Sequence, residues 1–94
     1  MIHAMVRQNV KDYEAWKKVF DEDGTNRKMA SSKGGHVFRA LDDPNNVFVL
    51  LEFDDQDKMT KFMNSDGLKE AMKKGGVMGK PDIYLMDEGT RTKV

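Results

Sequence analysis

His36 and Glu52 have the side-chain types that general acid–base chemistry needs. They lie on either side of a turn-rich segment, residues 42–46, and counting an antiparallel hairpin around this turn places His36 opposite Glu52. A carboxylate beside an imidazole can fix the tautomer of the ring and raise its basicity, as a general base requires. We therefore name this pair as the candidate catalytic residues. The alternative is a cross-strand salt bridge in an interface between two copies of the chain.

The expected pairing depends on the register of the hairpin. The same count places Leu41 opposite Val47. It also places Phe38 opposite Leu50, and a slip of the strands would undo every pair. His3 could join the same face, and two imidazoles with one carboxylate could in principle bind a metal. Their spacing matches no recognisable ligand pattern, so we expect no metal site.

Apolar side chains at helical spacing form a candidate binding surface. Tyr13, Trp16 and Phe20 recur at the 3.6-residue period, and Phe62 lies with Met63 on a later apolar stripe. The indole N–H of Trp16 needs a partner when buried, which makes Trp16 the residue most readily placed at a cavity wall. We name Trp16, Phe20 and Phe62 as candidate substrate-binding residues. Core packing explains the same spacing without a ligand.

Arg39 completes the candidate substrate-binding set. It shares strand parity with Val37 and Leu41, and hence lies on the most apolar face of the predicted sheet. An arginine there must be paired, lie at a sheet edge or hold an anionic ligand. The edge position is favoured, and the role in ligand binding stays open.

Several common motifs are absent from the sequence. Gly34-Gly35 and Gly75-Gly76 belong to neither of the glycine-rich phosphate-binding patterns. The chain also lacks a Ser-His-Asp order, a His-Glu-x-x-His motif and a calcium loop. The candidate chemistry therefore depends on the residues named above.

The segment 46–54 must position these residues, because it is the only run that is apolar at both side-chain parities. Successive side chains of a strand point to opposite faces, so the odd-numbered residues 47–53 share one face, and Phe48 and Leu50 share the other. A strand that is apolar on both faces usually lies in the middle of a sheet with something packed on each side. The rest of the chain must supply both coverings.

The remaining pattern predicts three more strands and the helices between them. A strand at residues 2–8 precedes a helix that Asn9 caps, with Asp12 at its third position. This helix ends near Glu22, where Gly24 can take the left-handed conformation. Residues 27–33 form a loop or a short helix. The other elements are a strand at 36–41, a helix capped by residues 54–57, a short helical turn capped by Ser65 and ended by Gly75-Gly76, and a strand at 82–86.

This order of elements predicts the ferredoxin-like β-α-β-β-α-β fold, an α+β arrangement with the helices on one side of a four-stranded antiparallel sheet. The other side would then expose Met5, Phe38, Phe48 and Leu50 together. Such a patch usually marks an association surface. We therefore expect a homodimer in which a second copy, related by a two-fold axis, covers the sheet.

Length and composition limit the classes of protein. The chain has 94 residues, enough for one domain, which we place at residues 1–88 with a flexible C-terminal tail at 89–94. The 16 basic and 16 acidic residues balance, so the net charge does not attract nucleic acid or an anionic membrane. Cysteine, a secretory signal and an apolar run of membrane-spanning length are absent. We expect a cytoplasmic protein without nucleic-acid or membrane partners.

Four segments carry a resemblance to a known group of proteins: Val10 to Lys17 with Phe20, Asp42 to Val47, Glu52 to Asp54, and Gly75 to Val77 with Pro81. In these segments, which cover most of residues 1–88, the chain resembles the dimeric α+β barrel superfamily. The resemblance is strongest to small domains similar to antibiotic-biosynthesis monooxygenases and to cyclases of unknown substrate. It implies a homodimer with sheets packed face to face and, in members that are enzymes, a small-molecule cavity between sheet and helices. The monooxygenases of this superfamily oxidise activated aromatic substrates without a metal or a flavin, whereas other members degrade haem, remove chloride or have no known activity.

Two hypotheses follow for the function. In the first, the protein is a cofactor-independent monooxygenase or cyclase, in which His36, tuned by Glu52, removes a proton from an aromatic or polyketide-like substrate. The aromatic residues of the binding set hold this substrate, and the resulting anion reacts with dioxygen or closes a ring, so we expect no cofactor. In the second, the protein binds a small ligand or assembles without catalysis, using the same side chains. The fold alone does not choose between them.

Overall fold

One four-stranded antiparallel sheet runs through the chain, with four helices packed against one of its sides. The computed structural model describes all residues from Met1 to Val94. The strands, in the spatial order β2-β3-β1-β4, are β1 (Ile2–Val10), β2 (Ser32–Ala40), β3 (Asp43–Phe53) and β4 (Val77–Asp87). The helices are α1 (Tyr13–Glu22), α2 (Gly24–Met29), α3 (Gln56–Met63) and α4 (Asp66–Lys74). This is the predicted ferredoxin-like α+β fold.

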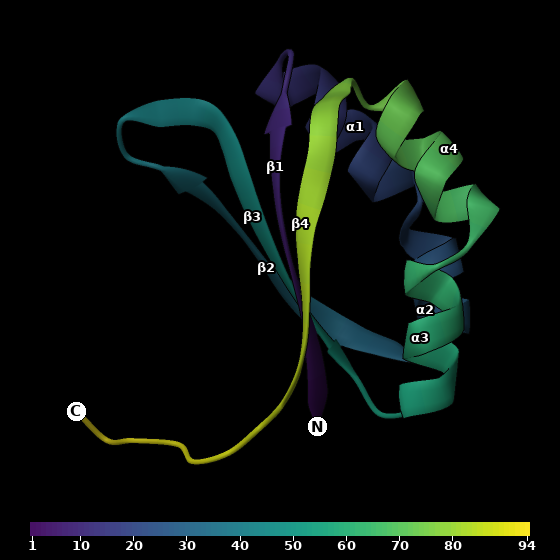
Figure 1. The fold of residues 1–94 in the computed structure, drawn as a ribbon, viewed down its shortest axis with the longest axis vertical. Coiled ribbons are helices and arrows are strands. Elements are labelled where there is room, and N and C mark those ends of the chain that lie inside the picture. The colour runs from purple at the N-terminus through teal and green to yellow at the C-terminus, as the bar shows by residue number, and fades with distance from the viewer.

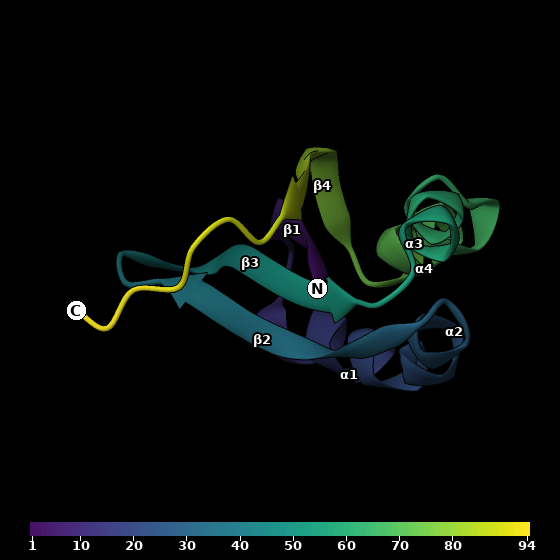
Figure 2. The ribbon, with the colours of Figure 1, turned by 90° about the horizontal axis from the view of Figure 1, so that it is seen from below.

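The helices form one layer, which Figure 1 shows on a single side of the sheet. Seen from below, they group into two pairs, α1 with α2 and α3 with α4 (Figure 2). The residues after Asp87 form no helix or strand and lead away from the body of the fold (Figure 1). No helix combines the length and the apolar character that crossing a membrane requires.

The two-sided apolar pattern of β3 has the predicted consequence. β3 lies inside the sheet, between β2 and β1. Its odd-numbered residues from Val47 to Phe53 are buried in the core between sheet and helices, with exposed fractions of 6% or less. Phe48 and Leu50 point to the other side of the sheet and are only partly covered. The helices therefore cover one face of β3 and leave the other partly exposed.

β1 extends two residues further than predicted, and this moves the start of the first helix. Asn9 pairs with Asn46 of β3 and with Met78 of β4, so sheet partners lie on both sides of it. The predicted cap at Asn9 is therefore wrong. Asp12 caps α1 instead, because its carboxylate accepts a hydrogen bond from the Ala15 N–H at 3.2 Å.

The segment that follows α1 is helical. Gly24 begins α2 and does not take the predicted left-handed conformation. Asp23, with φ near −82°, joins the two helices. The segment 27–33, predicted as a loop or a short helix, is helical only to Met29, and its last two residues already belong to β2. α2 brings Arg27 back against α1, where its Nη1 donates to the Phe20 carbonyl oxygen at 2.7 Å.

The register of the β2–β3 hairpin differs from the prediction by two residues. His36 faces Leu50, so the predicted pairing of His36 with Glu52 is wrong, and Gly34 stands opposite Glu52 instead. Phe38 likewise faces Phe48 rather than Leu50. Because side chains alternate with a period of two, a shift of two leaves each residue on its predicted face. His36 therefore lies on the side of the sheet away from the helices.

The shift in register originates at the turn. The predicted turn spans residues 42–46, whereas Ala40 pairs with Asp43 around a turn of only residues 41 and 42. The next pair joins Arg39 to Val47, so the predicted pairing of Leu41 with Val47 is also wrong. Residues 44–46 of β3 have no partner in β2. This irregularity separates the pair at the turn, Ala40 with Asp43, from the pairing in the rest of the hairpin.

The second helical region matches the prediction. Asp55 caps α3 and Ser65 caps α4, each accepting a hydrogen bond from the backbone N–H three residues on. Gly75 and Gly76 follow α4, and Gly76 takes a φ of 80°, which favours glycine. β4 begins at Val77, earlier than the predicted residue 82, and as an edge strand it accommodates a proline in its interior.

The side of the sheet away from the helices, called the open face below, is apolar at its centre and carries paired charges. Its side chains are His3, Met5, Arg7, His36, Phe38, Phe48, Leu50, Glu52, Asp82, Tyr84 and Met86. Phe38 and Tyr84 are 50% and 57% exposed. The Arg7 Nε atom lies 2.9 Å from a carboxylate oxygen of Asp82. Because these charges are paired within the chain, the apolar side chains are the part of the open face that lacks a partner.

We expect the open face to be the interface of a homodimer, and a charge at its centre should separate the subunits. Phe38→Glu places a carboxylate where an apolar side chain would lose its water on association. A central anchor residue contributes about 2–4 kcal/mol, so the dimer dissociation constant should rise on the order of 100-fold. Sedimentation equilibrium measures this change.

Met29→Glu is the matched control for the interface prediction. Met29 is 75% exposed and lies on α2, in the helix layer. The same change of side chain there should leave the dimer intact. A wild-type chain that stays monomeric at high concentration would contradict the expected interface.

Candidate functional site

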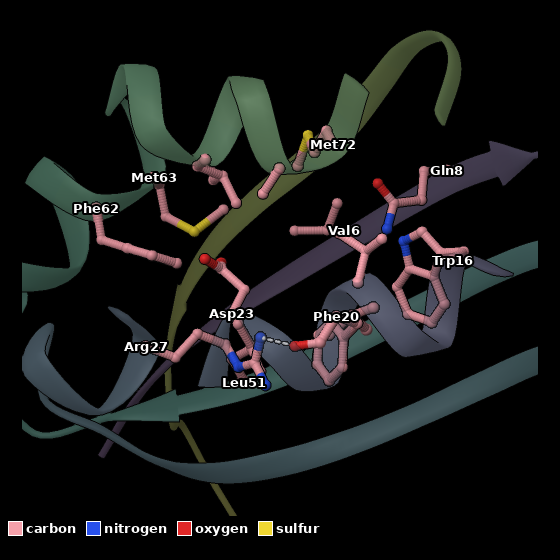
Figure 3. A pocket seen from close by; sticks show the side chains of 14 residues that line it. Val6, Gln8, Trp16, Phe20, Asp23, Arg27, Leu51, Phe62, Met63 and Met72 are labelled. Atoms are coloured by element: carbon pink, nitrogen blue, oxygen red, sulfur yellow. Dashed lines mark hydrogen bonds between the residues drawn. The ribbon is translucent and has the colours of Figure 1, made fainter. Parts of the chain in front are cut away.

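A cavity lies between the helix layer and the sheet (Figure 3). Its walls come from β1, β3 and all four helices. The lining residues are Val6, Gln8, Trp16, Val19, Phe20, Asp23, Arg27, Val49, Leu51, Phe62, Met63, Leu68, Ala71 and Met72. Eleven of these 14 residues are hydrophobic, so the cavity suits an apolar ligand with a few polar groups to orient it.

The cavity is small as it stands. Its volume is about 50 Å³. A dry apolar cavity that binds benzene has roughly 150 Å³, and ligand sites typically have about 300–1,000 Å³. Met63 and Met72 form part of the wall, and unbranched thioether side chains adapt to irregular shapes. A ligand therefore requires these methionines or the α3–α4 pair to move outward.

Trp16 is held in the cavity wall from two sides. It is 3% exposed and stacks on Phe20 with ring centroids 5.0 Å apart. Gly75, at the end of α4, lies so close that a Cβ atom there would stand 3.1 Å from Trp16 Cδ1. Trp16, Phe20 and Phe62 all line this cavity, Phe62 from α3 and the other two from α1. Their binding of a substrate remains a prediction.

Gln8 is the only polar side chain that the sheet contributes to the cavity. It is 4% exposed, and its Oε1 atom has no hydrogen-bond partner in the chain. Figure 3 shows its amide at the same end of the cavity as the indole nitrogen of Trp16. A buried acceptor without a donor costs about 1–3 kcal/mol. Gln8 is therefore an acceptor that a bound ligand could satisfy.

Two charged residues, Asp23 and Arg27, also line the cavity. The Arg27 guanidinium lies over the Phe20 ring, 3.7 Å from its centroid. Burial lowers the pKa of Arg27 from its ordinary value, and the Asp23 and Asp21 carboxylates oppose this shift. An arginine nevertheless keeps its charge at neutral pH. Asp23 accepts a hydrogen bond from the Asn26 side chain at 2.7 Å. The wall thus holds a carboxylate and a guanidinium on adjacent turns of the chain.

An outer groove of about 440 Å³ adjoins the cavity. The two spaces share Asp23, Phe62 and Leu68 in their walls. The groove is more polar, and Lys58 and Lys61 of α3 lie along it. The groove lies between the α1–α2 connection and the α3–α4 pair.

The predicted catalytic pair lies outside the cavity. His36 and Glu52 are on the open face, so the sheet separates them from a ligand in the cavity of the same chain. Glu52 has His3 as its neighbour, with 3.6 Å between His3 Nε2 and Glu52 Oε1. His36 packs beside Phe38, with ring centroids 5.8 Å apart. The carboxylate and the imidazole that were expected to act together belong to different pairs.

Arg39 lies at the edge of the sheet, on the outer strand β2. Its guanidinium stacks over the Tyr13 ring at 3.8 Å, and its Nε atom donates to the Pro44 carbonyl oxygen at 3.0 Å. It does not line the cavity. The structure therefore places Arg39 with Tyr13 and apart from the other three residues of the predicted binding set.

Sequence reasoning missed Gln8, Asp23 and Arg27 as cavity residues. Gln8 gave a signal, because it shares strand parity with Ala4 and Val6 and so interrupts an apolar face of β1 with an amide. Asp23 and Arg27 gave none, since Asp23 belongs to the predicted end of the first helix and Arg27 to a segment that the sequence pattern left undecided between loop and helix. Their position follows from the packing of α2 on α1.

Comparison with solved structures identifies the fold. SnoaB, a cofactor-independent oxygenase from Streptomyces nogalater, superposes with a TM-score of 0.76 at 12% identity, over 99% of this chain and 97% of that one. A protein from Bordetella bronchiseptica, classed as an antibiotic biosynthesis monooxygenase, gives 0.75 at 14% identity, over 95% and 97%. Rv0793 from Mycobacterium tuberculosis gives 0.72 at 6% identity, over 98% of both chains.

These similarities extend over nearly the whole of each chain, so the protein shares the ferredoxin-like α+β fold of these structures. At such low identity they establish the fold and not the activity. No protein-family model matches the sequence, and no curated protein matches it either.

The unpaired amide of Gln8 predicts a stability change. Gln8→Leu keeps the size of the side chain and removes a buried acceptor that has no donor. The free energy of unfolding should rise by about 1 kcal/mol, which corresponds to roughly 4–8 °C in the melting temperature of a domain of this size. Thermal unfolding followed by circular dichroism measures it.

Gln56→Leu is the control, because Gln56 is the only other glutamine and is exposed at the start of α3. Its melting temperature should stay within about 2 °C of the wild type, as is usual for surface substitutions of 0.5 kcal/mol or less. A melting temperature that falls in Gln8→Leu would show that the amide is already satisfied in the folded chain.

Proposed function

We propose that the protein binds a small aromatic or polyketide-like molecule in the cavity between helices and sheet, and acts on it as a cofactor-independent monooxygenase or cyclase. The observation that carries this proposal is the cavity itself, an apolar space that contains a buried unpaired amide and, in its wall, a carboxylate and a guanidinium. A solved structure of the same fold, SnoaB, is a cofactor-independent oxygenase. The fold similarity supports the class of chemistry and leaves the substrate open.

The reaction begins with removal of a proton from the bound molecule. Asp23 is the proposed base, because it is the only carboxylate in the cavity wall. Arg27 supplies a positive charge in the same wall, where it would stabilise the enolate or phenolate that forms. His36 is not assigned this step, because the sheet stands between it and the cavity.

The anion can then follow either of two routes. In the monooxygenase route, a carbanion derived from a CH₂ group adds to dioxygen, and protonation gives a hydroperoxide. The hydroperoxide loses water, so that one oxygen atom remains as a new carbonyl and the other leaves in the water, with no external reductant. In the cyclase route, the carbanion attacks a carbonyl of the same molecule and no dioxygen is consumed.

A non-catalytic role in ligand binding is the second candidate. It is favoured by the composition of the wall, in which 11 of 14 residues are hydrophobic and no histidine is present. In this case Asp23 and Arg27 serve to anchor α2 on α1, as the bond from Arg27 to the Phe20 carbonyl already does. The ligand would be bound and released unchanged.

Dioxygen uptake with anthrone tests the catalytic proposal. Anthrone has an activated CH₂ group that becomes a carbonyl in the oxygenase route, so the wild type should consume one dioxygen for each quinone formed. Asp23→Asn should lower kcat by about 100-fold or more, as is typical for loss of a general base. An oxygen electrode together with the absorbance of the quinone measures both.

Asp57→Asn is the matched control for this assay. Asp57 is exposed in the first turn of α3 and does not line the cavity, so the same substitution there should leave kcat unchanged. Anthrone that binds without uptake of dioxygen, and without any change of the compound, would favour the non-catalytic candidate. Turnover that persists in Asp23→Asn would exclude Asp23 as the base.

A further inference from the structure

We propose that the ligand of the cavity is a hydroxylated aromatic molecule whose hydroxyl group donates a hydrogen bond to Oε1 of Gln8. This inference rests on the proposed function, because it takes the same cavity as the ligand site and specifies the class of ligand. It does not depend on the chemical step. Its basis is the position of Gln8 in the sheet, the state of its amide and the space around it.

The backbone around Gln8 is irregular. On one side Gln8 pairs with Val47 of β3. On the other side Arg7 pairs with Asp82 and Asn9 pairs with Met78, so residues 79–81 of β4 stand opposite Gln8 alone. Extra residues of this kind form a bulge, and bulges often lie beside binding sites because they change the direction of a side chain. A bulge beside the one polar position in the sheet wall of the cavity fits a ligand-binding role.

The amide of Gln8 can select a chemical group. Its Oε1 atom is buried and has no donor within the chain. A carbonyl oxygen only accepts, so it discriminates in favour of ligands that carry an O–H or N–H group. Trp16, whose indole N–H only donates, lies at the same end of the cavity (Figure 3). A hydroxyl group can both donate and accept, so it is compatible with an acceptor and a donor at this end of the cavity.

The remaining walls specify what carries the hydroxyl group. Apart from Asp23 and Arg27, the other lining residues are apolar side chains, such as Phe20 and Leu51. A flat apolar ring matches them better than a sugar or a peptide would, because each buried polar group of those ligands would lose its hydrogen bonds to water. The parts of a larger ligand that do not fit the cavity would extend into the outer groove.

Three small probes test the inference: phenol, toluene and anisole. Phenol and toluene have nearly the same shape, anisole carries one additional methyl group on its oxygen, and only phenol can donate a hydrogen bond. Binding is read from the fluorescence of Trp16, which is the only tryptophan of the chain and lies in the cavity wall. Excitation at the red edge of the indole band avoids absorption by the probes. The proteins compared are the wild type, Gln8→Leu and the control Gln56→Leu.

The expected result is a change in the ratio of affinities rather than in any single affinity. The preference for phenol over toluene should be about tenfold greater in the wild type and in Gln56→Leu than in Gln8→Leu, as for one buried hydrogen bond. Anisole should behave like toluene in all three proteins. Toluene should bind Gln8→Leu at least as well as the wild type, which shows at the same time that the variant is folded and its cavity intact.

Several outcomes overturn the inference. An unchanged ratio in Gln8→Leu would mean that Gln8 does not recognise the hydroxyl group. Anisole that binds as phenol does would mean that the ligand oxygen accepts rather than donates. If none of the probes alters the Trp16 emission, the cavity does not admit aromatic rings. Dioxygen uptake with anthrone is measured separately, so a Gln8-dependent preference for phenol without uptake supports the inference and contradicts only the catalytic step.

Discussion

The structure depends on one constraint, which is that β3 is apolar on both of its faces. A strand of this kind loses stability wherever either face meets water, because each exposed apolar side chain forgoes about 1.5–3 kcal/mol of burial. The helices cover the face formed by the odd-numbered residues from Val47 to Phe53. Within the helix layer they form two pairs (Figure 2), and the cavity lies where side chains from both pairs meet the sheet. The other face of β3 carries Phe48 and Leu50, which lie partly exposed in the open face.

The interior of the fold departs from simple core packing at Gln8. A buried amide without a partner lowers stability, and an aliphatic residue would fill the same position in β1 more favourably. Such a departure is expected where a site binds something, since a side chain left unsatisfied by its own chain is free to recognise a ligand. The same logic applies to Arg27, whose charge is retained in a half-buried position beside Phe20. At the candidate site, therefore, polar side chains occupy core positions where apolar side chains would make the fold more stable.

The sequence was sufficient for the fold and for part of the site. The predictions that held depend on local patterns, which neighbouring residues in the sequence determine. These patterns are the alternation in β1 and β3, the caps at Asp55 and Ser65, and the stripe that contains Trp16. The hairpin register was not predictable, because Pro44 and its neighbours contain enough turn-forming residues for several turns, and only the packing of β3 against β1 decides which forms. The pairing of His36 with Glu52 failed for that reason. Asp23 and Arg27 were missed because their place depends on how α2 packs on α1.

Gln8 and the methionines of the cavity belong to parts of the fold that are held in different ways. The amide is carried by β1, an interior strand that is paired on both sides, whereas Met63 and Met72 are carried by short helices at the surface. Equilibrium preference among ligands and the rate at which they enter are therefore set by different residues. Substitutions in α3 and α4 should alter association and dissociation rates together and leave their ratio nearly constant, while substitutions in β1 should alter the ratio. Selectivity and speed of exchange could accordingly diverge independently among proteins that share this architecture.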